Sequence, residues 1–470
     1  MKRSIPRILA SCVLLLACTF NLLSQTTALE QVSLDKAIDV AMNNYPAIRA
    51  TKAQAAAATA GIDLARTAYL PKADLLWQEN RATRNNIFGL LLPQSIIPAI
   101  SGPVLGTNNS ASGWGTAGGT LVTWEPFDFG LRKANVDLAR AQTKQAEASV
   151  EITRLDVETA VVDAYLALIA AQEAVRAAQA NVDRLQVFAK SVQVLVDNQL
   201  RPGVDSSRAE AELASARNFL IQAEQTVDIA RTNLAEAMGV TGTRVSVEQG
   251  PFLDLPLDNV LPEINISLHP LAISQNAAIG IVQAREQVLR HSYFPKFYLQ
   301  SAFYARGTAD LLNGQIDNSK GWYPNVVNWA SGVQITFPTL DIFSIRARRK
   351  VETNNEVAER ARYDQTVQTI KAQELRARSE VEGARRIAAN TPVQLKAAQE
   401  TQIRATARYQ ADLTNVVEVA EAQRLLTQAE IEDAVARLKV WRALLFEAKA
   451  RGDLKPFLQQ VTTASIQRSK

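Results

Sequence analysis

The sequence is poor in residues that interrupt helices and in residues that build reactive sites. Its 470 residues include only 20 glycines, 17 prolines, two histidines and two cysteines. Scarce glycine and proline permit long uninterrupted helices. Both cysteines, Cys12 and Cys18, precede a cleavage site expected after Ala28, so the mature chain would contain no disulfide and no thiolate metal site.

The two histidines, His269 and His291, have no metal-ligand partner at regular spacing. No glycine-rich loop with the lysine of a phosphate-binding motif follows a strand. The common catalytic and cofactor-binding patterns are therefore missing. We expect a protein that is not an enzyme and that holds neither a cofactor nor a metal.

The first 28 residues predict an export signal. Three cations precede an apolar stretch at residues 8–23, and a small-residue cleavage site follows it. An uncleaved anchor is one alternative, although the stretch is short for a membrane span. A second alternative is a lipobox at residues 15–18, in which Cys18 becomes a lipidated N-terminus.

Charge and hydropathy restrict the partners. Removing Lys2, Arg3 and Arg7 with the signal leaves 48 cations against 47 acids, so the mature net charge is about +1. This balance argues against a nucleic-acid partner. Beyond the signal no apolar run is long enough for a transmembrane helix. If the mature chain spans a membrane, it must use strands, because a backbone in lipid has to satisfy its own hydrogen bonds.

The chain contains an internal duplication. In each copy two prolines 25 residues apart bracket a helical stretch, Pro46 and Pro71 in the first and Pro270 and Pro295 in the second. Both copies then follow one plan: strand, loop, strand, very long helix, tight break, long helix. The expected segments are a signal at 1–28, a first copy at 29–247, a proline-rich connector at 248–264, a second copy at 265–457 and a tail at 458–470.

The expected elements follow from periodicity. In the first copy they are a short helix, strands at 72–88 and 117–127, and helices at 130–198 and 204–238. In the second they are a short helix at 271–292, strands at 296–306 and 328–338, and helices at 344–411 and 415–450. Along the long helices apolar residues recur at steps of four and three, which predicts a seam facing another helix. A helix over 130–198 would be about 100 Å long, so the sequence predicts a bundle or a tube.

The strand regions distinguish this chain from a plain coiled coil. Val333, Ile335 and Phe337 alternate with small or polar residues, and five of the six tryptophans fall in these regions. Alternation with aromatic residues near strand ends is typical of membrane β-barrels, with an ordinary aromatic core as the alternative. Four strands cannot close a barrel, so several chains must share one. The predicted fold class is a mixed α and β membrane protein.

These residues resemble the TolC family of outer-membrane efflux proteins over essentially the whole mature chain. Leu200 through Ala216 resembles the turn and start of the family's second long helix, and Arg408 through Gln423 resembles the same region in its second repeat. The proline pairs resemble the family's short helices that lead into strands. The double occurrence, in register, carries the resemblance.

The resemblance implies a homotrimer with a 12-stranded barrel in the outer membrane, in contact with its lipid, and a long α-helical tunnel in the periplasm. A periplasmic adaptor (membrane fusion) protein and an inner-membrane pump of RND or ABC type would open the tunnel's inner end. The chain would then be a passive exit duct for efflux or type I secretion. The alternative is a periplasmic helical-hairpin adaptor that bridges two membranes, which would need neither aromatic strands nor a duplicated barrel segment.

The resemblance also assigns gating residues. Glu418 and Glu421 occupy positions where the family places acidic residues at the pore constriction. Three residues apart, they share a helix face, and threefold symmetry would gather six carboxylates that attract cations. The alternative is two solvated surface acids.

A latch between helices is implied by the match of Asp205 and Tyr409 to the family's latch positions. Thr414 stands where the family often has a basic residue, and Arg201 occupies the equivalent place in the other copy. We therefore expect Arg201 to be the candidate substitute for the missing cation.

The tip turns at the periplasmic end depart from the family pattern. A glycine usually precedes the leucine of each turn, but Gln199 precedes Leu200 and Asp412 precedes Leu413, with Gly203 displaced into the next helix. Glycine permits the left-handed backbone that helix ends often use, aspartate tolerates it partly and glutamine poorly. The tip geometry is therefore the least predictable part of the candidate site.

Overall fold

The computed structural model describes residues 30–83, 110–257, 263–309, 311 and 315–468. The expected signal at 1–28 and Cys18 lie outside the described residues. No described helix is long and apolar enough to cross a membrane. The elements are β1 (Glu30–Val32), α2 (Leu34–Asn44), α3 (Pro46–Thr67), β2 (Lys72–Thr83), β3 (Ser112–Phe127), α4 (Leu131–Asp197), α5 (Gly203–Ala237), β4 (Val245–Val247), η1 (Ile266–Leu268), α6 (Pro270–His291), β5 (Lys296–Thr308), β6 (Val326–Thr336), α7 (Asp341–Gln410), α8 (Val416–Arg451) and α9 (Lys455–Arg468).

The chain divides into two compact units that cut across the two sequence copies. The sheet unit contains Ala53–Ala148 and Ile273–Gln365, and the hairpin unit contains Met1–Lys52, Ser149–Ala272 and Thr366–Lys470. Each unit therefore takes matching elements from both copies, because α4 and α7 are long enough to contribute to both units.

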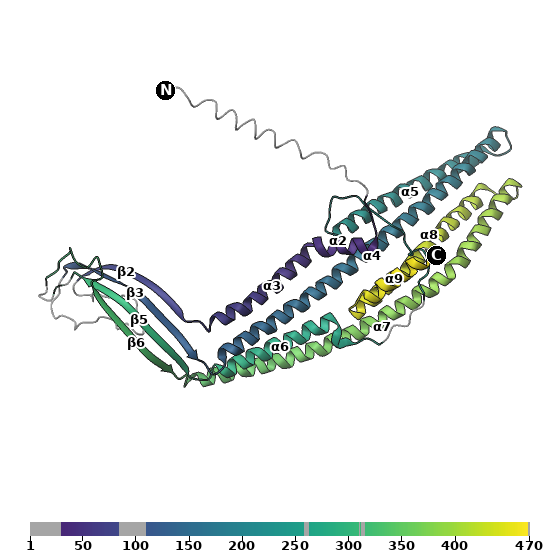
Figure 1. Ribbon diagram of the computed structural model, residues 1–470. Coiled ribbons are helices and arrows are strands. Elements are labelled where there is room, and N and C mark those ends of the chain that lie inside the picture. Colours follow the sequence, from purple (N-terminus) through teal and green to yellow (C-terminus); the bar gives the residue numbers. More distant parts are fainter. Residues whose placement is uncertain (1–29, 84–109, 258–262, 310, 312–314, 469–470) are drawn as a thin grey trace, which may run out of the picture. The chain divides into compact units, whose positions relative to one another are not determined.

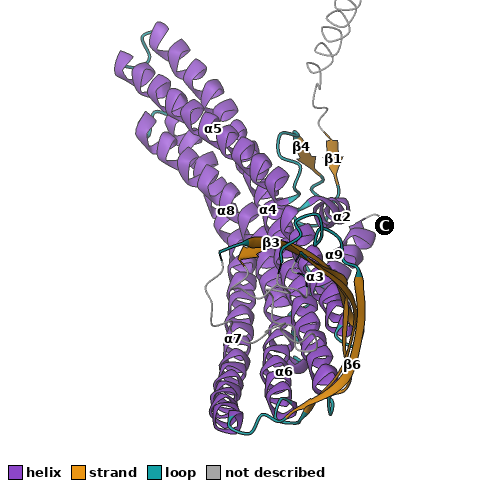
Figure 2. Ribbon diagram, turned by 90° about the vertical axis from the view of Figure 1, so that its left-hand side faces the viewer, coloured by secondary structure: helices purple, strands orange, loops and turns teal. Residues whose placement is uncertain are grey.

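In the sheet unit, four antiparallel strands form one sheet in the order β2-β3-β5-β6, and they lie side by side in Figure 1. Figure 2 shows them as a single curved sheet. Its two outer strands, β2 and β6, each have one neighbour among the described strands.

One face of this sheet is apolar and exposed. Leu75 pairs with Thr120, Thr120 pairs with Phe303, and Phe303 pairs with Trp329, so all four side chains lie on one face. The exposed fractions are 86% for Leu75 and 78% for Trp329. The alternation expected from the sequence thus yields a sheet with an uncovered apolar face.

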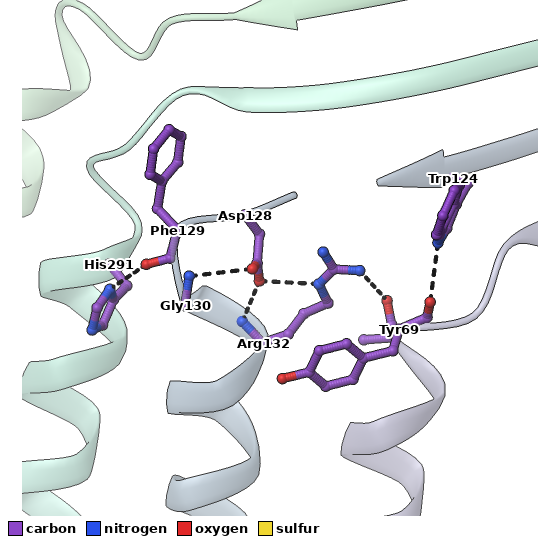
Figure 3. Close-up of polar contacts among 8 residues, drawn as sticks. Tyr69, Trp124, Asp128, Phe129, Gly130, Arg132 and His291 are labelled. Atoms are coloured by element: carbon purple, nitrogen blue, oxygen red, sulfur yellow. Dashed lines mark hydrogen bonds and ion pairs between the residues drawn. The ribbon is translucent and has the colours of Figure 1, made fainter. Parts of the chain in front are cut away.

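The junction from β3 into α4 is held by one carboxylate (Figure 3). Asp128 accepts hydrogen bonds from the backbone N–H groups of Gly130 and Arg132 and pairs with the Arg132 guanidinium at 3.0 Å. Burial alone would raise the pKa of Asp128, but the hydrogen bonds from Arg132 and Gly130 outweigh it and hold the pKa below its ordinary value. Arg132 also lies over the Tyr69 ring, 4.9 Å from its centroid.

The same junction is tied to the turn after α3 and to the last residue of α6. Trp124 of β3 donates its indole N–H to the Tyr69 carbonyl at 3.1 Å, and His291 Nδ1 lies 2.8 Å from the Phe129 carbonyl. Phe129 and Gly130 both have positive φ, which turns the chain sharply from strand to helix.

In the hairpin unit, α4 pairs with α5 and α7 pairs with α8 (Figure 1). The apolar residues that recur at steps of four and three are all buried or half-buried from Val157 to Val196 on α4 and from Leu213 to Ala237 on α5. The apolar seam residues of α7 from Val367 to Ala398 are likewise buried or half-buried. The prediction of long helices packed along apolar seams is confirmed. Alanine is frequent on the seams, which lets helix axes approach closely.

The largest core cluster of the hairpin unit centres on two fully buried aromatic residues. Trp441 of α8 donates its indole N–H to the Asp254 carbonyl at 2.9 Å. The Tyr165 hydroxyl of α4 lies 3.1 Å from the Val32 carbonyl and 2.9 Å from the Glu248 carbonyl, next to the parallel strands β1 and β4. Burial raises the pKa of Tyr165, so it stays a neutral donor.

Several element bounds differ from the sequence-based expectation. The strand expected at 72–88 is described as Lys72–Thr83, and its remaining residues lie outside the described residues. β3 begins at Ser112, five residues before the expected start, because its glycines and small residues hid the strand pattern. α9 occupies most of the segment expected as a tail, and its Phe457 and Val461 are buried one helical turn apart.

Candidate functional site

The ends of the two helical hairpins carry the candidate gating residues, all within the hairpin unit. Gln199 follows α4 with φ 59° and Asp412 follows α7 with φ 62°. Leu200 N–H bonds to the Leu195 carbonyl, and Leu413 N–H bonds to the Arg408 carbonyl. This is the six-to-one hydrogen bond of a helix-ending motif that normally uses glycine.

Both turns therefore adopt the left-handed backbone without glycine. A non-glycine residue in this region costs of order 1 kcal/mol. Gly203 instead begins α5. Leu200 and Leu413 are each 68% exposed, so the two tips present a leucine outward.

The two hairpins meet near these turns around Tyr409. Arg201 donates to the Tyr409 carbonyl at 2.7 Å, its guanidinium lies 4.6 Å from the centroid of the Tyr409 ring, and it pairs with Asp412 at 2.6 Å. Tyr409 is 2% exposed and packs edge-on against Phe188 of α4 at 5.4 Å between centroids. We call Arg201, Asp205, Tyr409 and Asp412 the latch cluster.

The contact between Asp205 and Tyr409 is the weaker part of the latch cluster. The Tyr409 hydroxyl lies 3.5 Å from Asp205 Oδ2, at the limit for a hydrogen bond. Burial and then the Asp205 charge raise the pKa of Tyr409, so the phenol is neutral at physiological pH. Within the latch cluster, Arg201 therefore makes the closer contacts between the hairpins.

Thr414 lies apart from the latch cluster. It donates to the carboxylate of Glu418, one turn along, rather than to any latch residue. Arg201, from the other hairpin, is the cation that contacts Tyr409 and Asp412.

Glu418 and Glu421 are both exposed on the first two turns of α8. Glu418 lies 3.5 Å from Arg408, and Glu421 lies 3.0 Å from Arg424. Exposed pairs of this kind contribute about 0–1 kcal/mol. Sequence reasoning missed these two arginines, which partly balance the charge of the proposed acidic ring.

Sequence reasoning also missed a polar clamp between the hairpins. Arg184 of α4 donates to Gln423 at 3.1 Å and Thr427 at 3.3 Å, and it pairs with Glu430 at 2.9 Å, all on α8. The available signal was an arginine placed between the seam residues of α4. A cavity of 460 Å³ lies beside the clamp, and Arg184, Phe188, Tyr409 and Gln423 are among its lining residues.

The chain matches a known protein family over most of its length. The sequence profile of a family described as "Outer membrane efflux protein" matches residues 37–240 and 275–445. No match is found among curated protein sequences.

Three solved structures share the fold over most of the chain. The CmeC outer membrane channel of Campylobacter jejuni has a TM-score of 0.71 and 16% identity, covering 92% of this chain and 89% of that one. The open-state MtrE channel of Neisseria gonorrhoeae has a TM-score of 0.68 and 20% identity, covering 89% of each chain. VceC of Vibrio cholerae has a TM-score of 0.68 and 15% identity, covering 89% of this chain and 96% of that one.

Proposed function

Because this chain belongs to the outer membrane efflux protein family, we propose that three copies of it form one exit duct, which an adaptor and an inner-membrane pump open from the periplasm. The chain is an outer-membrane protein with a large periplasmic helical portion, and it serves as an exit duct for efflux. The trimer, the pump partners and any role in type I secretion belong to the proposal.

The observation that carries the proposal is the sheet with an exposed apolar face, whose outer strands β2 and β6 each lack a second neighbour among the described strands. In lipid, β2 and β6 would each expose a row of unpaired N–H and C=O groups at several kcal/mol per group. Pairing β2 of one copy with β6 of the next satisfies both edges. The threefold number follows the family resemblance and yields a 12-stranded barrel.

The latch cluster and the acids supply the proposed gate. Arg201 and Asp205 come from one hairpin, and Tyr409 and Asp412 come from the other, so separating the hairpins breaks their contacts. Glu418 sits in the first turn of α8 beside the same end. In a trimer these positions recur three times around one axis, where rings of charge control ion passage.

Ion selectivity tests the acidic ring. In planar bilayers under a KCl gradient, the wild-type channel should favour K⁺, and Glu418→Gln with Glu421→Gln should shift the reversal potential toward zero. Glu224→Gln with Glu236→Gln, on exposed positions further along α5, is the matched control. An unchanged reversal potential in the Glu418→Gln, Glu421→Gln variant would show that these acids do not line the pore.

The flanking arginines give a test of opposite sign. Replacing Arg408 and Arg424 by glutamine removes the positive charge that pairs with each acid, so K⁺ preference should increase.

The partners are tested in a Gram-negative strain that lacks its own exit duct. Expression of this chain should restore drug resistance when a matching pump and adaptor are present and should fail when the adaptor is deleted. Resistance that does not depend on the adaptor would contradict the three-part assembly.

A further inference from the structure

A band of cations surrounds the end of the sheet at which the strands join the helices. We define the basic collar as residues 63–72, 128–133, 285–296 and 341–350. These segments hold 11 lysines and arginines against four acids, or +7 per chain, whereas the whole mature chain carries about +1. The net positive charge of the molecule is therefore concentrated in the collar.

Strand topology brings the four collar segments to one end of the sheet. In the antiparallel order β2-β3-β5-β6, the starts of β2 and β5 and the ends of β3 and β6 lie at that end. Each collar segment either leads into one of these strand ends or follows it. Figure 3 shows part of the collar, with Arg132 and His291 on neighbouring helices.

Most collar acids are already paired with collar arginines. Asp63 pairs with Arg66 at 2.9 Å, Asp128 with Arg132 at 3.0 Å, and Glu286 with Arg349 at 3.0 Å. Six other cations, all on the collar helices, are exposed and form no ion pair within the part of the chain that the structure describes: Lys133, Arg285, Arg290, Arg346, Arg348 and Lys350. These exposed cations are available to bind anions from outside the described chain.

Exposed aromatic and aliphatic residues lie between the strands and these cations. Leu340 is 80% exposed and Phe343 is 68% exposed. Phe343, Arg346 and Lys350 follow at steps of three and four, so they share one face of α7, with the aromatic ring nearest the strands. Aromatic rings at the membrane surface followed by cations reaching further out match a lipid headgroup region.

One groove in the collar combines cations with an apolar wall. Arg285 and Arg348 line a cavity of 290 Å³ together with Leu138, Val288 and Val351. Glu352 also lines it and accepts a hydrogen bond from Asn355 at 3.3 Å. Two guanidinium groups at one groove suit a phosphate, because each can donate two parallel hydrogen bonds to it.

We propose that the basic collar binds the phosphate groups of anionic phospholipids in the periplasmic leaflet of the outer membrane, with Arg285 and Arg348 forming the preferred headgroup site. The inference rests on the proposed insertion of the sheet into that membrane. Cations next to a membrane surface attract anionic lipids, and the attraction is screened within a Debye length.

The test is the lipid composition around the full-length protein. Wild-type protein is reconstituted in nanodiscs of phosphatidylethanolamine and phosphatidylglycerol at 3:1, and retained lipids are counted by native mass spectrometry. The collar variant replaces Arg285, Arg346, Arg348 and Lys350 by glutamine. The matched control replaces four exposed cations away from the strands by glutamine: Lys144, Arg217, Lys371 and Lys396.

We expect wild type and control to enrich phosphatidylglycerol over its bulk share. The enrichment by the collar variant should be at least about fivefold lower. Raising salt from about 0.05 to 0.5 M should weaken the wild-type enrichment, because the charges are exposed. Equal lipid retention by wild type and collar variant would overturn the proposal.

Other outcomes also decide the question. If the collar variant keeps its lipids but no longer sediments with isolated cell-wall sacculi, the collar binds the anionic wall polymer instead. If it keeps its lipids but changes ion selectivity, these cations face the channel. A wild-type protein that conducts ions without enriching phosphatidylglycerol would contradict this inference alone. A wild-type protein that does not enter bilayers would contradict the proposed function as well.

Discussion

The Arg201 side chain makes three contacts with the opposite hairpin, and removing it should open the duct. Its guanidinium is bound by the Tyr409 carbonyl, by the Tyr409 ring and by the Asp412 carboxylate. The side chain of Arg201 is 13% exposed and that of Asp412 is 78% exposed. Arg201→Ala removes all three contacts while leaving the backbone of the turn intact.

The magnitude follows from the three contacts. A hydrogen bond from a charged donor contributes about 1.5–3 kcal/mol. The cation–π contact adds about 0.5–1 kcal/mol, and the pair with solvated Asp412 adds little. The closed form should therefore lose about 2–4 kcal/mol per chain, which moves the closed-to-open ratio by about 30- to 1,000-fold.

Single-channel recording in planar bilayers measures this shift. Arg201→Ala should spend far more time in a high-conductance state than wild type. Arg201→Lys should be intermediate, because it keeps the charge but loses the planar stacking. Arg217→Ala, at an exposed position on α5, is the control. If Arg201→Ala conducts like wild type, the latch cluster does not hold the hairpins closed.

Three further predictions concern stability. Gln199→Gly should relieve the left-handed strain at φ 59° and slow hydrogen exchange of the tip amides, by about 0.5–1 kcal/mol locally. Asp128→Asn should lower thermal stability above about pH 4 and have less effect as pH falls further; because the folded pKa is depressed, the charge stabilises above the ordinary pKa and this is lost in acid. Tyr165→Phe should cost about 1–3 kcal/mol and speed exchange of the Glu248 amide, which donates to the Tyr165 hydroxyl at 3.1 Å.

The long helices and the strand alternation were predictable because both depend on side-chain period. Residues such as Val161 and Leu168 repeat at helical spacing and are fully buried. Val333 and Ile335 alternate with smaller or polar residues and share one exposed face of β6. Side-chain period is a local property of each helix or strand, so it can be read from the sequence without knowing how the elements pack together.

Other features depend on contacts between distant segments and were not predictable. The sequence does not show that Arg201 reaches the carbonyl of Tyr409, 208 positions away. β1 and β4 have three residues each, too few to establish alternation. Gln199 adopts a left-handed backbone that its residue type disfavours, because the hydrogen bond from the Leu200 N–H to the Leu195 carbonyl, which ends the helix, requires it.

The number of chains that share the sheet is the quantity on which the account depends. Light scattering of the mature, detergent-solubilised protein, with the detergent contribution subtracted, measures that number directly. Three chains per particle is the predicted result: each four-stranded sheet needs strands from other copies on both sides, and the family resemblance sets the number of copies at three. A single chain per particle, with β2 and β6 left unpaired, would contradict the shared barrel and with it the proposed duct.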